Sequence, residues 1–119
     1  MNPEIQCYNN GKFFSKEWTV NNRYHREDGP AIQRWRHDGS LWCEEWYIDN
    51  MHHRVDGPAY IRLSYEGRND YSEWYFYGRQ LDDNKIEDYK EWLISNNLVG
   101  KYYTQWTDEE KVLWSLSWL

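Results

Sequence analysis

HREDGPA at residues 25–31 returns as HRVDGPA at residues 53–59, an offset of 28 residues. The same offset relates glycines and tryptophans that lie outside this motif. These landmarks are Gly11, Gly39 and Gly67, together with Trp18, Trp46 and Trp74. Because separate landmarks share one register, the chain is predicted to consist of repeated structural units of 28 residues.

Two sets of turn signals divide each unit. In the first set, glycine supplies the positive φ angle that a tight turn needs. In the second set, asparagine or glycine occupies the turn, and both tolerate left-handed geometry. Two turns per unit predict two strands per unit, and hence an antiparallel meander of about six strands. The turns are expected at residues 10–11, 38–39 and 66–67, and at residues 21–22, 49–50 and 77–78.

Treating every turn as a two-residue turn fixes a register. Gln33 then faces Glu44 on the neighbouring strand, Trp35 faces Trp42, and Ala31 faces Trp46. Side chains alternate between the two faces of a strand. One face is predicted to hold Trp18, Val20, Trp46, Ile48, Trp74 and Phe76, and the other Glu17, Thr19, Glu45, Tyr47, Glu73 and Tyr75.

The repeated motif has a mechanical role in this register. His25 and His53 are expected beside tryptophan on the packed face, whereas Arg26 and Arg54 are expected beside glutamate on the other. Such cross-strand ion pairs contribute about 0.2–1 kcal/mol. Proline donates no N–H to the hydrogen bonds of a sheet. The strand that carries each motif is therefore predicted to break and change its pairing partner at the Asp-Gly-Pro residues. These residues are Asp28, Gly29 and Pro30, and Asp56, Gly57 and Pro58.

The chain changes character after residue 82, where the motif does not recur. Ile86, Tyr89 and Leu93 have helical spacing, and Thr107 with Glu110 forms a capping box that opens a second helix. The chain is therefore predicted to be one α+β, mainly β domain over residues 1–119. Hairpin repeats span residues 3–82 and a cap of two helices spans residues 83–119. The second helix is apolar over more than one stripe, so it is expected to be buried on two sides, inside the domain or in an interface.

The Glu-Trp-Tyr segment, its turn and the following His-Arg-x-Asp-Gly-Pro-Ala motif resemble MORN-like β-hairpin repeats. The closest likeness is to the variety found in bacteriophage and giant-virus proteins, and it covers about residues 10–82. This resemblance implies a scaffold or binding surface, and it supplies no catalytic residue.

Composition limits the partners. The formal net charge of −6 argues against a nucleic acid or an anionic membrane and suits a basic protein partner. No stretch is long and apolar enough for a membrane span, and no signal peptide is recognised. The chain is therefore expected in the cytoplasm, the host cytoplasm if it is viral. Cys7 and Cys43 are expected to be reduced thiols.

The candidates for catalysis and metal binding are weak. The four histidines are His25, His37, His52 and His53. His25 and His53 are repeat-equivalent and would lie two or more strands apart, too far to share one ion. Neither cysteine has an assigned histidine partner, and there is no glycine-rich phosphate loop. The prediction is a protein without enzymatic activity, metal or cofactor.

The predicted binding surface is the face opposite the tryptophans. It carries Tyr47, Tyr75, Glu45 and Glu73 beside Arg34 and Arg62, and tyrosine and arginine are favoured at interfaces. An ordinary solvated sheet face is the alternative for these residues. Trp114 and Trp118 on the last helix are expected either in the core or in a second contact.

The predicted function is a protein-binding module, a small phage protein that engages or inhibits a host protein, including a defence component. Two alternatives stay open at this point. One is a module in which exposed tryptophan and tyrosine side chains stack a sugar or a nucleotide base. The other is a structural homo-oligomer assembled through residues 107–119.

Overall fold

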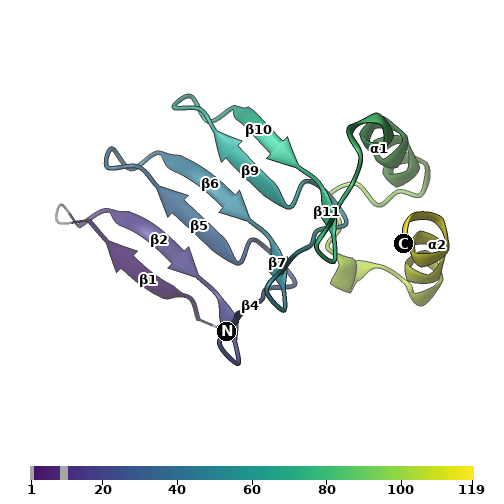
Figure 1. The fold of residues 1–119 in the computed structure, drawn as a ribbon, viewed down its shortest axis with the longest axis horizontal. Coiled ribbons are helices and arrows are strands. Elements are labelled where there is room, and N and C mark those ends of the chain that lie inside the picture. Colours follow the sequence, from purple (N-terminus) through teal and green to yellow (C-terminus); the bar gives the residue numbers. More distant parts are fainter. Residues whose placement is uncertain (1, 9–10) are drawn as a thin grey trace.

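The computed structural model describes residues 2–8 and 11–119. Its fold is α+β and mainly β, an antiparallel meander followed by two C-terminal helices, as predicted. The molecule is elongated, with extents of 48 × 33 × 22 Å. The helices lie beside the last hairpin, at the opposite end from β1 (Figure 1).

One sheet forms the body of the molecule. Its six antiparallel strands are neighbours in the order of the chain, with the two strands of each hairpin joined by a glycine turn. The strands are β1 (Glu4–Cys7), β2 (Phe13–Glu17), β5 (Ile32–Trp35), β6 (Leu41–Glu45), β9 (Tyr60–Leu63) and β10 (Asn69–Glu73).

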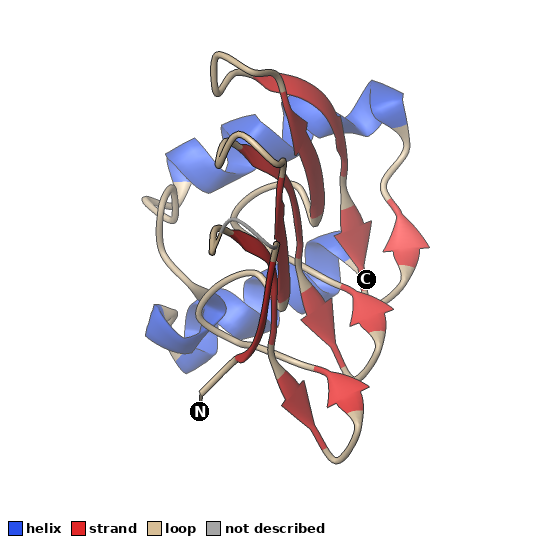
Figure 2. Cartoon of the chain, turned by 90° about the vertical axis from the view of Figure 1, so that its left-hand side faces the viewer, coloured by secondary structure: helices blue, strands red, loops and turns tan. Residues whose placement is uncertain are grey.

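Three short ribbons follow one another along one edge of the molecule (Figure 2). Each starts just after one of the repeated tryptophans and has two strands of two residues. Backbone hydrogen bonds join neighbouring ribbons, such as Arg26 N–H to the Tyr47 carbonyl at 3.1 Å and Arg54 N–H to the Tyr75 carbonyl at 3.2 Å. The ribbons are β3 (Thr19–Val20) with β4 (Arg23–Tyr24), β7 (Tyr47–Ile48) with β8 (Met51–His52), and β11 (Tyr75–Phe76) with β12 (Arg79–Gln80).

The predicted change of pairing at Asp-Gly-Pro is half right. Before the break, β4 and β8 pair only with the preceding strand of their own ribbon. After the break, β5 and β9 pair on both sides within the main sheet, not with a successor alone. The strand has two partners there because the preceding and following long strands both lie at hydrogen-bonding distance.

The asparagine turns are two-residue turns, as predicted. Both central residues have positive φ angles, for example 52° and 63° at Asn21 and Asn22. This geometry matches the twist of a hairpin. Val20 consequently pairs with Arg23, the predicted register. The third turn places Tyr77 at a φ angle of 47°, where a bulky residue is strained.

The glycine turns at residues 38–39 and 66–67 are longer than predicted, whereas the turn predicted at residues 10–11 includes a residue outside the described part of the chain. Arg36 N–H donates to the Ser40 carbonyl at 2.9 Å, so three residues lie inside the turn, with Gly39 at a φ angle of 91°. The extra residue makes Trp35 pair with Leu41, and the predicted pairing of Trp35 with Trp42 is wrong. A bulge then restores the register, and Gln33 pairs with Glu44 as predicted.

The arginines of the motif do not pair with glutamate across the strand. The Arg54 guanidinium carbon lies 3.9 Å from the centroid of the Trp46 ring, and Arg54 also donates to Asp56 at 3.0 Å and to the Pro58 carbonyl at 3.1 Å. Arg26 repeats this arrangement one unit earlier. The predicted cross-strand ion pairs are wrong because the loop bends back and brings the aspartate two residues ahead closer. A Cβ at Gly57 would lie only 2.7 Å from the Arg54 guanidinium carbon, which explains the glycine.

The main core lies between the third ribbon and the helices. It gathers residues from the last unit and from the cap around two aromatic side chains, Tyr89 and Trp114. The helical elements are the 3-10 helix η1 (Asp83–Lys85), α1 (Ile86–Ser95), the 3-10 helix η2 (Tyr103–Gln105) and α2 (Asp108–Trp118). The buried core residues are Val55, Trp74, Phe76, Tyr89, Leu93, Leu98, Trp106 and Trp114.

The three repeated tryptophans are all buried, with 8%, 7% and 6% exposure along the chain, but their covers differ. The helices cover Trp74, where the arginine position of the motif holds Asp82. Lys90 of α1 approaches this ring at 6.0 Å. Arg26 covers Trp18, with its guanidinium carbon 4.0 Å from the centroid of the ring.

Helix α2 begins with the predicted capping box, in which Thr107 and Glu110 exchange hydrogen bonds of 2.9 and 3.2 Å. Only one side of the helix is buried, the side that carries Trp114. The prediction of burial on two sides is wrong within the chain, because no second layer lies over α2. Its outer side exposes Val112, Leu113, Leu116 and Leu119.

Candidate functional site

The side of the sheet that faces away from the repeated tryptophans and the helices carries a network of tyrosines and carboxylates. We call it the tyrosine–carboxylate face. Its members are Tyr24, Tyr47, His52, Tyr60, Tyr71 and Tyr75, with Glu17, Glu45, Glu73, Arg34 and Arg62.

The repeat positions these side chains through the register of the main sheet. Glu17, Glu45 and Glu73 lie in one row across the sheet, on β2, β6 and β10. Every second strand therefore presents a carboxylate, and neighbouring carboxylates are two strand spacings, or about 10 Å, apart. Arg34 and Arg62 lie in the next row on the same face, on either side of Cys43.

Glu45 is the buried centre of the face. Glu45 is 8% exposed. Its carboxylate accepts hydrogen bonds from Arg34 at 3.0 Å, Tyr47 at 3.1 Å and His52 at 3.0 Å. Burial alone would raise the pKa of Glu45, but the hydrogen bonds from His52 and Tyr47 and the charge of Arg34 outweigh it, so this pKa lies below its ordinary value. Glu45 is therefore a charged group that the chain itself neutralises.

The outer two carboxylates of the row have tyrosine partners instead. Tyr24 donates to Glu17 at 3.1 Å, while Tyr71 and Tyr75 donate to Glu73 at 2.6 and 3.2 Å. Among the residues that the structure describes, no lysine or arginine forms an ion pair with Glu17 or Glu73. Neutral tyrosine donors therefore hold these two carboxylates in place.

Aromatic rings form a continuous stack over the ribbons. The centroid distances are 5.4 Å from Tyr24 to Tyr47, 4.3 Å from Tyr47 to His52, and 5.0 Å from His52 to Tyr75. Burial first, and then the neighbouring carboxylates, raise the pKa values of Tyr24, Tyr47 and Tyr75. The phenol groups therefore remain neutral hydrogen-bond donors, and the stack is rigid before any partner arrives.

The accessible part of the face lies toward β9 and β10. Tyr71 is 42% exposed and packs edge-on against Tyr60 at 6.1 Å. The Arg62 guanidinium carbon lies 4.6 Å from the centroid of the Tyr71 ring. An exposed tyrosine beside an exposed arginine and the charged Glu73 has the composition of a protein interface.

The face holds no assembled catalytic or metal centre. Cys43 is buried beneath Arg34, and its burial raises the pKa of the thiol, which makes it a poor nucleophile. Cys7 is exposed, and both cysteines are free thiols. Within residues 2–8 and 11–119, no group of three or more histidine, cysteine, aspartate or glutamate side chains is arranged to hold a metal ion.

The structure brings together six of the predicted contact residues and separates two from them. Arg34, Glu45, Tyr47, Arg62, Glu73 and Tyr75 share the tyrosine–carboxylate face. Trp114, which is 1% exposed, instead packs against Phe76 at 5.1 Å in the core. Trp118 packs edge-on against Tyr89 at 4.8 Å. Burial therefore removes Trp114 from the contact residues.

Several members of the face were not predicted from the sequence. The register already contained a signal for two of them, because Tyr24 pairs with Thr19 and His52 pairs with Tyr47, and both partners belong to the predicted face. The register contained a signal for Tyr60 and Tyr71 as well, because they pair with Glu73 and Arg62, two predicted members of the face, and the bulge leaves these pairs in the predicted register. A second missed feature is an exposed cluster at the turn end of the sheet, with Trp42, Tyr65 and Arg36.

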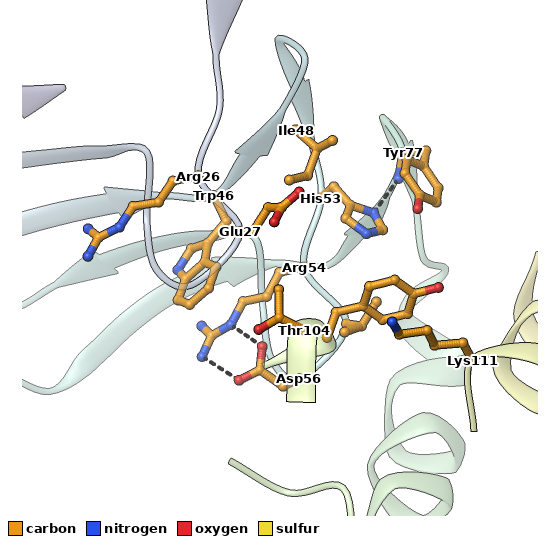
Figure 3. A pocket seen from close by; sticks show the side chains of 12 residues that line it. Arg26, Glu27, Trp46, Ile48, His53, Arg54, Asp56, Tyr77, Thr104 and Lys111 are labelled. Carbon is orange, nitrogen blue, oxygen red and sulfur yellow. Dashed lines mark hydrogen bonds and ion pairs between the residues drawn. The ribbon is translucent and has the colours of Figure 1, made fainter. Parts of the chain in front are cut away.

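On the opposite side of the sheet, a cavity of about 250 Å³ lies between the second unit and the helical cap (Figure 3). His53 lies at this cavity. Its ring stacks on Tyr77 at 3.9 Å, and its Nδ1 atom accepts the Tyr77 N–H at 2.9 Å. That hydrogen bond supports Tyr77 in its left-handed conformation. Burial lowers the pKa of His53 to about 4, so this histidine is neutral at pH 7.

No family model, no curated protein and no solved structure matches this chain. The likeness of residues 10–82 to MORN-like repeats therefore stays a prediction. None of the helices in the described part of the chain has the length and apolar character needed to cross a membrane.

Proposed function

We propose that this chain is a non-enzymatic protein-binding module whose tyrosine–carboxylate face docks on a basic surface of a partner protein. The observation that carries the proposal is the contrast within the row of carboxylates. Arg34 forms an ion pair with Glu45, whereas tyrosines are the only side-chain donors to Glu17 and Glu73 among the described residues. Two fixed negative charges thus flank a rigid aromatic stack.

The distance between these two charges indicates how far apart the basic side chains of a partner should lie. Glu17 on β2 and Glu73 on β10 are separated by four strand spacings, or about 19 Å. A partner with lysine or arginine side chains at that separation would satisfy both carboxylates, with an apolar or planar group over the stack between them. The net charge of −6 adds long-range attraction toward such a surface.

The rigidity of the face supports binding. Its tyrosine hydroxyl groups are fixed by hydrogen bonds to carboxylates, as in Tyr47 to Glu45 and Tyr75 to Glu73. Side chains that are already ordered lose little conformational freedom on association. A flexible tyrosine side chain would have to become ordered on binding, and this loss of freedom would cost conformational entropy.

The biological setting of the proposal comes from the resemblance to phage MORN-like repeats. This resemblance supports a role in the cytoplasm of a host cell, as an inhibitor or sequestering partner of a host protein, including a defence component.

A charge-removal experiment tests this function. The double variant Glu17→Gln/Glu73→Gln keeps hydrogen-bond acceptors for the tyrosines but removes both free charges. We expect the wild-type chain to retain one specific basic protein from host lysate. The double variant should bind that purified protein at least about tenfold more weakly at low salt, mainly through slower association.

The matched control is Glu91→Gln with Glu87→Gln, which removes two charges from α1 away from the face. Equal binding by the control and the face variant would refute the role of the face. Absence of any retained protein from lysates of all tested hosts would refute the function itself.

A second candidate function is self-association through α2. It is favoured by the outward side of this helix, where Val112, Leu116 and Leu119 recur at the spacing of one helical face and are all exposed. Sedimentation equilibrium of the wild-type chain and of Leu116→Asp tests it. A monomer that does not change mass between about 10 μM and 1 mM rules self-association out.

A further inference from the structure

The cavity of about 250 Å³ is built from segments that are distant in the sequence. Figure 3 shows Trp46, Ile48 and Glu27 from the repeats on one side and Thr104 and Lys111 from the cap on the other. An apolar cavity of about 150 Å³ is enough to hold a benzene ring. The space beside Trp46 therefore accommodates a single six-membered aromatic ring with a substituent.

The next repeat shows what the same surroundings hold when the chain fills them itself. In the third unit, Tyr89 packs edge-on against Trp74 at 5.8 Å and against Phe76 at 4.9 Å. The Tyr89 hydroxyl donates a hydrogen bond to the carbonyl of Val55, in the Asp-Gly-Pro loop of the preceding unit. A loop carbonyl, a tryptophan and a second apolar side chain thus form a three-sided socket for a phenol ring.

The residues of the second unit that are equivalent to this socket lie at the cavity. A shift of 28 residues relates Val55 to Glu27, Trp74 to Trp46, and Phe76 to Ile48. The three equivalent residues all line the cavity. The chain's own Tyr89 fills the socket in the third unit. In the second unit Arg54 lies over one face of Trp46, and the cap approaches this ring with Tyr102, at a centroid distance of 6.1 Å.

We infer that the cavity beside Trp46 is a binding site for a para-substituted phenol ring, whose hydroxyl donates to the Glu27 carbonyl as Tyr89 donates to Val55. This site lies on the opposite side of the sheet from the tyrosine–carboxylate face and does not depend on the function proposed for that face.

The remaining lining groups fit a neutral aromatic ring. The Arg54 guanidinium is already paired with Asp56 and covers one face of Trp46, so it brings no free charge into the cavity. The indole Nε1 of Trp46 is buried and has no hydrogen-bond partner. The Lys111 ammonium lies 5.0 Å from the centroid of the Tyr103 ring, at the cap side of the cavity.

The Glu27 side chain does not close the site, although the equivalent residue in the third unit is the apolar Val55. The Glu27 side chain is 63% exposed and approaches His25 at 3.7 Å. The Glu27 side chain lines the cavity beside Trp46 and Ile48 (Figure 3), while its backbone belongs to the loop that is equivalent to the loop of Val55.

Titration of the isotope-labelled full chain with p-cresol and with N-acetyl-tyrosinamide tests the site by two-dimensional NMR. We expect saturable shifts of the Trp46 indole signal and of the amides of residues 26–28 and 103–104, with a Kd on the order of 1 mM for p-cresol. Saturation by p-cresol alone assigns the site to free phenols, and saturation by N-acetyl-tyrosinamide as well assigns it to a tyrosine within a chain.

Two variants fill the cavity from opposite walls. Ile48→Trp replaces the residue that is equivalent to Phe76, and Thr104→Trp acts from an exposed position of η2, where folding is not at risk. Each should weaken p-cresol binding by about tenfold or more, because the indole occupies the space of the ring. The matched control is Ile94→Trp, which adds the same side chain at an exposed position of α1 and should leave binding unchanged.

The hydroxyl is tested with N-acetyl-phenylalaninamide, which should bind about threefold to tenfold more weakly than N-acetyl-tyrosinamide. Equal affinity for the two amides overturns the hydrogen bond to Glu27. The absence of saturable shifts at Trp46 up to about 10 mM of both probes, or undiminished binding in both cavity-filling variants, overturns the site.

Discussion

The arginine of the repeated motif offers a comparison inside one molecule. Arg26 and Arg54 have the same contacts with tryptophan, aspartate and a proline carbonyl. The two differ in the aspartate, since the side chain of Asp56 is 6% exposed and that of Asp28 is 70% exposed. Replacing each arginine by alanine therefore measures the effect of burial on one structural unit.

We expect Arg54→Ala to lower the free energy of unfolding by about 3–5 kcal/mol. It removes a desolvated cation–π contact of about 2 kcal/mol and leaves the buried Asp56 carboxylate without its partner. Arg26→Ala should cost only about 1–2 kcal/mol, because solvent hydrates Asp28 and an exposed ion pair contributes at most about 1 kcal/mol. The difference between the two variants should be about 2 kcal/mol.

Urea unfolding followed by circular dichroism measures both variants under the same conditions. A third variant, Arg54→Ala with Asp56→Asn, removes the stranded charge and should recover part of the loss. The reasoning is refuted if Arg26→Ala and Arg54→Ala lose the same free energy within about 0.5 kcal/mol, or if Asp56→Asn does not improve Arg54→Ala.

Three further substitutions test other parts of the fold. Because the folded pKa of His53 is about 4 and its unfolded pKa about 6.5, stability should be complete above pH 6.5 and fall as pH drops toward 4, by up to about 1.4 kcal/mol per pH unit. In urea titrations at several pH values, His53→Gln should flatten this dependence, and an unchanged slope would exclude His53 as its source. Tyr89→Phe should cost about 1–3 kcal/mol by leaving the Val55 carbonyl buried without its donor, a loss that calorimetry would detect and that a neutral result would contradict. Asn50→Ala should cost about 1–2 kcal/mol, because Asn50 has a φ angle of 64° and accepts the Tyr24 N–H at 2.7 Å. Asn50→Gly should recover the backbone part of that loss, and equal melting temperatures for both would argue against strain at this turn.

Much of the fold could be predicted because the period of the chain repeats local physics. Asn21, Asn22 and Asn50 tolerate positive φ angles, so the first two turns of the second set followed from residue type. The third, with Tyr77, followed from the period of the repeat. The alternation of side chains then separated Trp46 from Glu45 and Tyr47, and this part of the prediction described six members of the binding face. Thr107 and Glu110 likewise fixed the start of α2 through a purely local hydrogen-bond pattern.

The errors concern contacts that depend on loop conformation. Glu45 is the nearest acidic residue to Arg54 by strand register, but the bend at Gly57 brings Asp56 closer. The burial of Trp114 and the exposure of Leu116 depend on how α2 is rotated against the third ribbon, and a helix that is apolar on all sides gives no signal for that rotation. The cavity joins Glu27, Trp46, Ile48, Thr104 and Lys111, and their proximity is a property of the assembled molecule.

The arginines that lie over Trp18 and Trp46 also set how the molecule can change in length. In these two units a side chain of the repeat covers the indole, whereas the helices of the cap cover Trp74. Duplicating residues 26–53 would therefore insert another self-contained hairpin while leaving both ends intact. The tyrosine–carboxylate face would gain one more carboxylate, so adding a unit would lengthen this face by two strand spacings, or about 10 Å.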